Sequence, residues 1–218
     1  MTLDVHIWFD IVCPWCYIGK RRFEQAAQAY DGELRVEYHS FELAPDTPVD
    51  FTGSEIDFLV EYKGMPREQV RQMLDQMTAL GASEGLRYDF AALQHTNTLL
   101  AHQALHHAKG HRRQAELLER LFQAYFTQGR HLGKVDELVA LGTEVGLDGD
   151  QLRQALVGGR HAAAVRQDIA TARQLGITGV PFYVIDNRYG VSGAQSPEVF
   201  ASALQRAAQD RAEAKEAS

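Results

Sequence analysis

Hydrophobic and polar positions in the first forty residues follow three successive patterns. Residues 5–12 are β-branched, aromatic and almost continuously apolar, which predicts a strand buried on both faces of a sheet. Apolar residues then recur at helical spacing until Asp31-Gly32, a pair that ends helices. Residues 34–38 alternate apolar and polar side chains, as a strand does. The chain therefore opens with a strand, a helix and a strand.

The middle of the chain carries a helical pattern only. From about residue 54 to residue 175 we find helical periodicity and no convincing strand. Glycine-rich breaks divide this stretch into six or seven predicted helices; they fall at 64–66, 81–85, 110, 129–133, 146–149 and 158–159. The stretch is typical of an all-helical insertion.

Strand patterns return after Gly176. Residues 182–185 and 189–192 flank the polar turn 186–188, which predicts an antiparallel hairpin. A last helix follows, with Ser196 at its N-cap and Pro197 at its first position, and we expect 213–218 to be a solvated tail.

The order of these elements predicts the fold class. Two separated segments that complete one sheet indicate an α/β, thioredoxin-like fold with a large all-helical domain inserted between the second and third strands. We expect residues 1–45 and 176–218 to form the thioredoxin-like domain and residues 46–175 to form the inserted helical domain.

Composition and charge narrow the function. The 218 residues are 45% hydrophobic, enough for a sizeable core, and 29 acidic against 22 basic residues give a net charge of −7, which disfavours nucleic acid as a partner. The N-terminus lacks a basic leader segment, and no apolar run is long enough for a membrane span. We therefore expect a cytoplasmic protein without a membrane partner; its oligomeric state stays open.

The two cysteines are three positions apart, at Cys13 and Cys16. Cys13 falls where the first strand meets the first helix, and the N-H groups and dipole of a helix N-terminus stabilise a thiolate there. Cys16, one helical turn later, is placed to attack a mixed disulfide on Cys13. Half of a zinc site is the alternative, but a second cysteine pair is missing. The pair therefore predicts a redox centre with Cys13 as nucleophile and Cys16 as resolving thiol, and no cofactor beyond it.

A proline directly precedes the first strand of the hairpin. In a protein with a Cys-X-X-Cys pair, the Val180-Pro181 bond is expected to be cis and to face the cysteines, with the backbone of Val180 available to an extended substrate. A trans proline that merely opens a strand is the alternative. Pro14 and Trp15, between the cysteines, are further candidates for substrate contact, and Trp15 is expected to be exposed.

These motifs together resemble the DsbA family of thiol-disulfide oxidoreductases, in particular its cytosolic FrnE-like branch. The resemblance spans nearly the whole chain and is carried by Asp10 with residues 13–21, and by the segments 41–43, 179–182 and 192–195. It implies dithiol-disulfide exchange with protein or small-molecule thiols, with Cys13 and Cys16 catalytic and Val180-Pro181 facing them.

The same superfamily includes kappa-class glutathione transferases and 2-hydroxychromene-2-carboxylate isomerases, which usually carry serine at the position of Cys13. Residues 97–102 are similar to a segment of the isomerases. Glutathione is therefore a candidate co-substrate. The candidate glutathione or anion site comprises Asn97 with Gly193, Ala194 and Gln195, which lead into a helix N-terminus; a simple helix cap is the alternative reading of that loop.

Several other residues attract attention. Five histidines gather in one region, and His102 and His106 have the i, i+4 spacing of metal ligands, but Gln103 stands where the zincin pattern requires glutamate. We therefore interpret His95, His102, His106, His107 and His111 as structural or solvated and predict no metal site. Asp10 is expected to be solvated at the surface.

Three functional hypotheses follow from the sequence. The first is a thiol-disulfide oxidoreductase, the second a glutathione-dependent isomerase or transferase in which Cys13 activates a small molecule. The third, a binding module without catalysis, leaves an intact Cys-X-X-Cys pair without a purpose.

Overall fold

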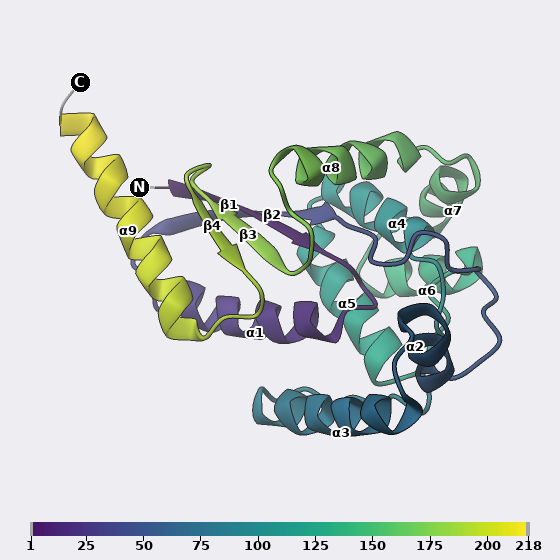
Figure 1. Cartoon of the computed structure of the whole chain (residues 1–218). Coiled ribbons are helices and arrows are strands. Elements are labelled where there is room, and N and C mark those ends of the chain that lie inside the picture. Colours follow the sequence, from purple (N-terminus) through teal and green to yellow (C-terminus); the bar gives the residue numbers. More distant parts are fainter. Residues whose placement is uncertain (1, 217–218) are drawn as a thin grey trace. The chain divides into compact units, whose positions relative to one another are not determined.

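The computed structural model describes residues 2–216 and divides the chain into two compact units (Figure 1). The thioredoxin-like unit ends at Phe41 and resumes at Asp168, and the helical unit is Glu42–Gln167. The sequence pattern predicts the divisions later in the chain, after residue 45 and after residue 175. The second division falls inside a helix, where no composition break exists to mark it.

A four-stranded mixed sheet forms the centre of the thioredoxin-like unit. Its strands are β1 (Thr2–Phe9), β2 (Glu33–Ser40), β3 (Phe182–Ile185) and β4 (Tyr189–Ser192), in the spatial order β2-β1-β3-β4. β1 pairs parallel with β2 and antiparallel with β3, and β3 pairs antiparallel with β4. The predicted thioredoxin-like fold with a helical insertion after the second strand is confirmed.

Two helices cover this sheet on one face. α1 (Pro14–Gln28) and α9 (Pro197–Glu216) pack on each other, and α9 also packs on β1, β3 and β4 (Figure 1). The rings of Phe23, Tyr183 and Phe200, all fully buried, meet with centroids 4.6 to 5.6 Å apart. This aromatic cluster joins α1, β3 and α9 at the centre of the core.

The other face of the sheet carries a smaller apolar cluster. Trp8, Ala172 and Ile177 are buried there, and half-buried Val180 packs on them. Toward the start of β1 this face becomes polar, because Leu3, Val5 and Ile7 point into the core while the residues between them point away. β1 therefore has an apolar surface on the face toward α1 and α9 and a polar surface, near its start, on the opposite face.

Seven helices lie between β2 and β3 in the sequence, and the last of them contains the second division: α2 (Glu55–Lys63), α3 (Arg67–Ser83), α4 (Leu99–Gly110), α5 (Gln114–Phe126), α6 (Val135–Glu144), α7 (Gly149–Val157) and α8 (Ala162–Gln174). Their number agrees with the sequence prediction, because glycine ends most of them as expected. α8 ends at Gln174, and Gly176 follows it with a φ of +72°, which lets Ile177 N-H reach back to the Ala172 carbonyl at 2.9 Å.

Several predicted boundaries are wrong; among them, the first strand begins at Thr2 instead of Val5, and the second strand extends over Glu33–Ser40. The first strand ends at Phe9, three residues earlier than expected, because Ile11 is apolar and fully buried without belonging to the strand. The last helix continues to Glu216 through the segment expected to be a tail, and the end of that segment, 217–218, lies outside the described residues. The hairpin strands lie where predicted; Asp186 and Asn187 both have positive φ, which suits the twist of a tight hairpin.

Candidate active site

Cys13 occupies the N-cap of α1. A short turn follows β1, Cys13 N-H donates to the Asp10 carbonyl at 3.2 Å, and the backbone of Cys13 is extended. Pro14 holds the first helical position, where its missing N-H costs no hydrogen bond. The sulfur of Cys13 therefore lies at the positive end of the helix dipole, beside backbone N-H groups that the helix itself does not use.

Cys16 follows one helical turn later. Its N-H donates to the Cys13 carbonyl at 3.0 Å, and both cysteines are free thiols and buried, with 4% and 3% of their surfaces exposed. Burial, then the hydrogen bond to Cys13 and the charge on it, raise the pKa of Cys16 well above its usual value. Cys16 is therefore a protonated thiol at neutral pH.

The proline expected to face the cysteines does so. The Val180-Pro181 bond is cis, which confirms the prediction, and the Cys13 thiol donates to the Val180 carbonyl with 3.7 Å between sulfur and oxygen. Pro181 is buried and Val180 is half-buried. The backbone that precedes the proline thus lies directly beside the first sulfur.

The loop 193–195 lies against the same region. Gly193 N-H donates to the Pro181 carbonyl at 2.8 Å, and the Arg22 guanidinium donates to the Ala194 carbonyl at 2.7 Å. The N-H of Gln195 is also used, by the Gly193 carbonyl at 3.0 Å. In the candidate glutathione or anion site, the backbone N-H groups of Gly193 and Gln195 therefore already donate hydrogen bonds within the protein.

Gly19 is the point where these segments meet α1. A Cβ atom at this position would lie 2.6 Å from the hydroxyl oxygen of Tyr183, 2.9 Å from Cγ of Pro181 and 3.4 Å from Cα of Ala194. Only glycine allows the helix to approach this closely. No local sequence pattern marks Gly19, because the atoms that require it belong to residues far along the chain.

Tyr183 is a second residue that the sequence analysis missed. It is fully buried, and its hydroxyl has no hydrogen-bond partner among the described residues. Burial raises the pKa of Tyr183 well above its usual value, and the charges of Cys16 and Cys13 are among the further causes. Leaving such a buried hydroxyl without a partner costs about 1–3 kcal/mol.

Asp10 is buried, and the expectation that it is solvated is wrong. None of its surface is exposed, and its carbonyl accepts the N-H of Cys13 in the turn that leads into α1. Asp10 acts on Cys16 in two directions: a backbone hydrogen bond from Asp10 lowers the pKa of Cys16, and the carboxylate charge raises it. The residue therefore belongs to the site.

Trp15 is exposed as predicted, with 43% of its surface open to solvent between two buried cysteines. Pro14 beside it is half-buried. An exposed indole at this point offers an apolar surface to a partner molecule.

Asn97 belongs to the helical unit and has a structural role there. Its amide nitrogen donates to the Pro45 carbonyl at 2.8 Å, and its amide oxygen accepts from Leu99 N-H at 2.9 Å. The second bond satisfies a free N-H at the start of α4. Both ends of the side chain are thus engaged.

The five histidines have different surroundings. His95 is buried, contacts Glu55 at 2.7 Å and stacks on Phe58. His102 is fully buried within α4, and His106 stacks on His161 with 6.5 Å between ring centroids. His107 is buried and His111 exposed. Among residues 2–216 none of these five joins two other potential ligands in a metal-binding group.

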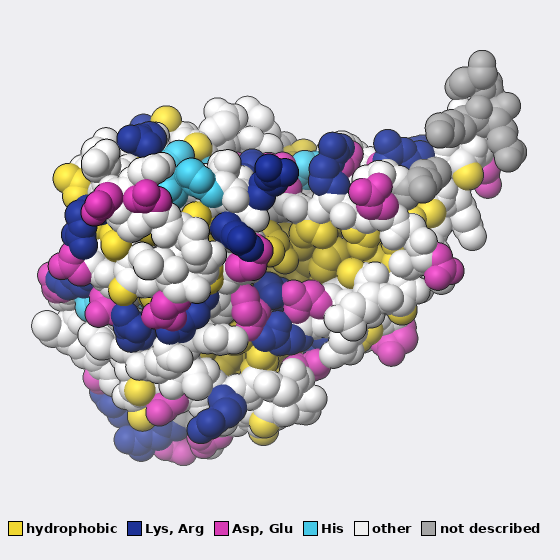
Figure 2. Space-filling model, turned by 180° about the vertical axis from the view of Figure 1, so that it is seen from behind, with side chains coloured by type: hydrophobic (Ala, Val, Ile, Leu, Met, Phe, Trp, Pro, Cys, Tyr) yellow, Lys and Arg dark blue, Asp and Glu magenta, His cyan; other side chains and the backbone are white. Residues whose placement is uncertain are grey.

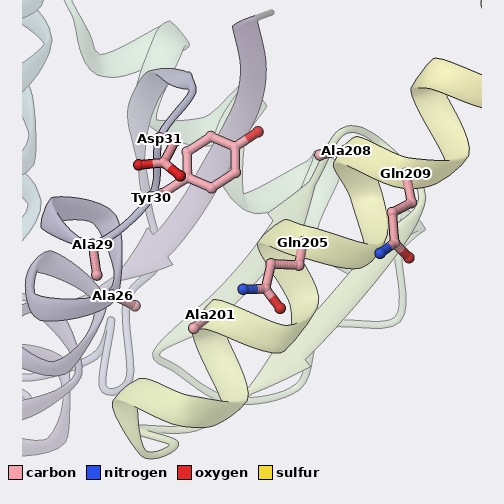
Figure 3. Close-up of a pocket in the computed structure, with 8 residues that line it drawn as sticks. All are labelled: Ala26, Ala29, Tyr30, Asp31, Ala201, Gln205, Ala208 and Gln209. Atoms are coloured by element: carbon pink, nitrogen blue, oxygen red, sulfur yellow. The ribbon is translucent and has the colours of Figure 1, made fainter.

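A hollow between α1 and α9 is separate from the cysteines. It encloses about 240 Å³ and is lined by Ala26, Ala29, Tyr30, Asp31, Ala201, Gln205, Ala208 and Gln209 (Figure 3). This volume is below the usual 300–1,000 Å³ of a small-molecule pocket. None of the predicted site residues contributes to its lining.

On the face in Figure 2, basic and acidic side chains are interspersed. No helix among residues 2–216 has the length and apolar character of a membrane span.

Known proteins resemble this chain in sequence and in fold. The family model of the DSBA-like thioredoxin domain matches residues 4–205. The uncharacterized protein YwbO of Bacillus subtilis is 32% identical over 206 residues, covering 94% of this chain and 96% of its own. The crystal structure of a probable DsbA oxidoreductase from Streptomyces coelicolor has a TM-score of 0.88 and 40% identity, covering 94% of this chain and 89% of its own.

More distant structures share the fold. A 2-hydroxychromene-2-carboxylate isomerase has a TM-score of 0.72 and 18% identity, with 98% of both chains covered. The cytosolic disulfide reductase DsbM from Pseudomonas aeruginosa, solved with GSH, has a TM-score of 0.66 and 18% identity, covering 94% of this chain and 99% of its own.

Proposed function

The chain belongs to the family of DSBA-like thioredoxin domains, and from this premise we propose that it exchanges disulfides with protein or low-molecular-weight thiols through Cys13 and Cys16. The observation that carries the proposal is the placement of Cys13 at the N-cap of α1, with its sulfur 3.7 Å from the Val180 carbonyl oxygen and a second, buried thiol one turn later.

The proposed reaction has two steps. The Cys13 thiolate attacks one sulfur of a substrate disulfide, the S–S bond breaks, and the other substrate sulfur leaves as a thiolate. Cys16 then loses its proton and attacks the Cys13 sulfur, which releases the second substrate sulfur. The substrate gains two electrons and becomes a dithiol, and the Cys13–Cys16 pair becomes a disulfide. The reverse sequence oxidises a dithiol substrate.

The raised pKa of Cys16 separates the two steps. While Cys16 stays protonated, Cys13 is free to react with the substrate first. The second step needs a proton acceptor for Cys16, and the buried carboxylate of Asp10 is the charged side chain that acts on it. We assign Asp10 this role.

The substrate is proposed to dock along the backbone at Val180. An extended peptide pairs with main-chain groups, and the Val180 carbonyl is beside the sulfur that reacts. Exposed Trp15, with Pro14, offers further apolar contact next to Cys13 in the sequence. This arrangement favours main-chain recognition with little dependence on the substrate sequence.

Glutathione is the alternative small-molecule substrate. It is favoured by the fold shared with a reductase solved with GSH and with the isomerase. In that case Gly193, Ala194 and Gln195, with Asn97, are the candidate contacts. The internal hydrogen bonds at Gly193, Gln195 and Asn97 make this alternative the weaker one. We also propose a cytoplasmic location, where a reducing environment keeps a lone thiol pair available for reaction.

The first test replaces the nucleophile. We expect Cys13→Ser to reduce insulin disulfide reduction by dithiothreitol to the uncatalysed rate, because no sulfur remains at the helix N-terminus. The matched control is Val157→Ser, which places the same side chain at a 73% exposed position and should keep wild-type turnover. Wild-type turnover by Cys13→Ser would refute the proposed function.

The second test uses the raised pKa of Cys16. We expect iodoacetamide to label Cys13 and leave Cys16 unlabelled at pH 7, because alkylation requires a thiolate. In Cys13→Ser, labelling of Cys16 should rise only at pH values above the usual cysteine midpoint of about 8.5. Mass spectrometry of the labelled protein over a pH series measures both. Half-maximal labelling of Cys16 near pH 7 would contradict the assignment of Cys16 as the protonated partner.

A further inference from the structure

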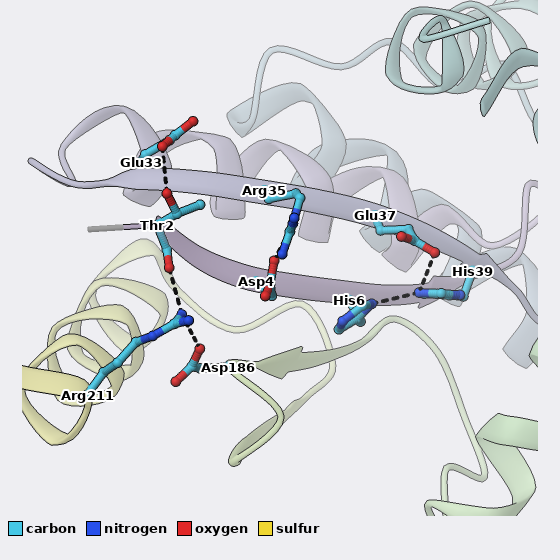
Figure 4. A network of polar contacts seen from close by, with 9 residues as sticks. All are labelled: Thr2, Asp4, His6, Glu33, Arg35, Glu37, His39, Asp186 and Arg211. Atoms are coloured by element: carbon cyan, nitrogen blue, oxygen red, sulfur yellow. Dashed lines mark hydrogen bonds and ion pairs between the residues drawn. The ribbon is translucent and has the colours of Figure 1, made fainter. Parts of the chain in front are cut away.

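The polar face of β1 and β2 carries a group of side chains that the redox chemistry does not use. In the parallel register His6 lies opposite Glu37, and Trp8 lies opposite His39, so the polar side chains project from the same face (Figure 4). We propose that His6, Glu37 and His39 bind a divalent transition-metal ion, with zinc as the probe.

The distances fit one ion. Nδ1 of His6 is 2.9 Å from Nε2 of His39, which is 3.4 Å from Oε1 of Glu37, and all three potential ligand atoms lie within 4.8 Å of one another. Zinc binds imidazole nitrogen and carboxylate oxygen at about 2.0–2.2 Å, so tetrahedral ligands are separated by about 3.3–3.6 Å. Small side-chain rotations bring the three atoms to this spacing.

Asp168 fixes the orientation of His39. Its Oδ1 contacts Nδ1 of His39 at 3.0 Å, and its Oδ2 accepts from Ser40 N-H at 2.8 Å. With the proton on Nδ1 donated to this carboxylate, Nε2 of His39 carries the lone pair that faces His6 and Glu37. A carboxylate that orients a metal-binding histidine in this way is a regular feature of zinc sites.

The surroundings hold the site rigid. The Trp8 ring stacks on His39 with 4.6 Å between centroids, and Trp8 Nε1-H donates to the Asp168 carbonyl at 3.2 Å. His39 and Asp168 each expose 12% of their side chains, whereas Glu37 exposes 34%. Two imidazoles and one carboxylate on paired strands thus form a half-buried site that is open on one side. The donor set is one that zinc uses with a fourth position left to water.

The same side chains without a metal form a hydrogen-bond chain from His6 through His39 to Asp168. Dependence on Glu37 distinguishes metal binding from this series of hydrogen bonds. Glu37 is a ligand of the proposed metal ion, whereas the hydrogen bonds from His6 through His39 to Asp168 do not require it. Glu33 provides a matched control: it lies on the same strand and face, four residues earlier, and bonds Thr2 instead.

The experiment is a zinc titration of the full-length protein with Cys13 and Cys16 oxidised to a disulfide, so that their thiolates cannot bind the metal. Calorimetry, competition with a coloured chelator, and the visible spectrum of the cobalt(II) form give stoichiometry, affinity and geometry. We expect one equivalent of zinc per chain, and a rise in melting temperature with zinc. Because the cysteines are blocked, the outcome is independent of the redox proposal.

The variants decide whether this is the site. Glu37→Gln should lower zinc affinity at least tenfold, His39→Asn should abolish stoichiometric binding, and Asp168→Asn should lower affinity about 10- to 100-fold. Glu33→Gln should bind as the wild type does. If His39→Asn does not fold, His6→Asn serves in its place. Absence of saturable binding to the wild type, or equal binding by Glu37→Gln and the wild type, would overturn the proposal.

Discussion

The Cys16→Ser variant is expected to accumulate as a mixed disulfide through Cys13 and to lose nearly all dithiol turnover. The first step needs only the Cys13 sulfur, which the substitution leaves at the helix N-terminus. Release needs an attacking thiol one turn away, and a serine hydroxyl cannot take that part. Intramolecular attack has an effective concentration that added thiol does not reach, so the loss should exceed a hundredfold. Mass spectrometry of the adduct and insulin reduction measure the two effects.

The same variant separates the two enzymatic hypotheses. If Cys13 only activates glutathione or another small molecule, Cys16 is dispensable, and Cys16→Ser keeps its activity without a trapped adduct. Cys13→Ser is the control, because it should show neither turnover nor adduct under either hypothesis. Undiminished turnover by Cys16→Ser with no adduct would refute the two-cysteine mechanism and favour the isomerase or transferase reading.

Much of the fold could be predicted because its signals are local. The hairpin strands Phe182–Ile185 and Tyr189–Ser192 were located from strand patterns on both sides of a polar turn. The helices of the insertion were bounded by glycines, which adopt the left-handed conformation that ends a helix. Cys13 at the N-cap and the cis bond before Pro181 likewise follow from short motifs.

The parts of the site that the sequence did not reveal depend on contacts between distant segments. Asp10 has the polarity of a surface residue, and only the folded turn shows that it is buried near Cys16. In the sequence Tyr183 has the pattern of an ordinary strand residue. Only the folded structure shows that its hydroxyl is buried without a hydrogen-bond partner. Sequence spacing alone gives no measure of such burial.

The histidines show the same limit. His102 and His106 have metal-ligand spacing along a helix, yet the side chain of His102 is fully buried. His6 and His39 are 33 residues apart, and Asp168 is 129 residues beyond His39. The register of a parallel strand pair and the return of α8 bring them together, and neither is encoded in local spacing. The prediction of no metal site considers only the cysteine pair and the five histidines between His95 and His111, because these are the candidates that sequence spacing brings together.

Gly19→Ala should destabilise the protein by about 1–3 kcal/mol, although the substitution lies inside a helix. In an exposed helix interior the change from glycine to alanine stabilises by about 1 kcal/mol. At Gly19 the added Cβ would lie 2.6 Å from the Tyr183 hydroxyl and 2.9 Å from Cγ of Pro181, so α1 or the segment at Pro181 must move. Urea unfolding measures the free energy, and insulin reduction measures the effect on the adjacent cysteines.

Two further variants test the cause of this loss. Gly110→Ala, at the end of α4, meets nothing within 4 Å of its Cβ and should lose no stability. Tyr183→Phe removes the hydroxyl that is both unpaired and closest to Gly19, so the double variant Gly19→Ala/Tyr183→Phe should regain part of the lost free energy. A loss of equal size in the presence and absence of the hydroxyl would mean that the contact with Tyr183 does not limit the approach of α1. Cγ of Pro181, the other atom within 3 Å of the added Cβ, would then limit the approach of the helix.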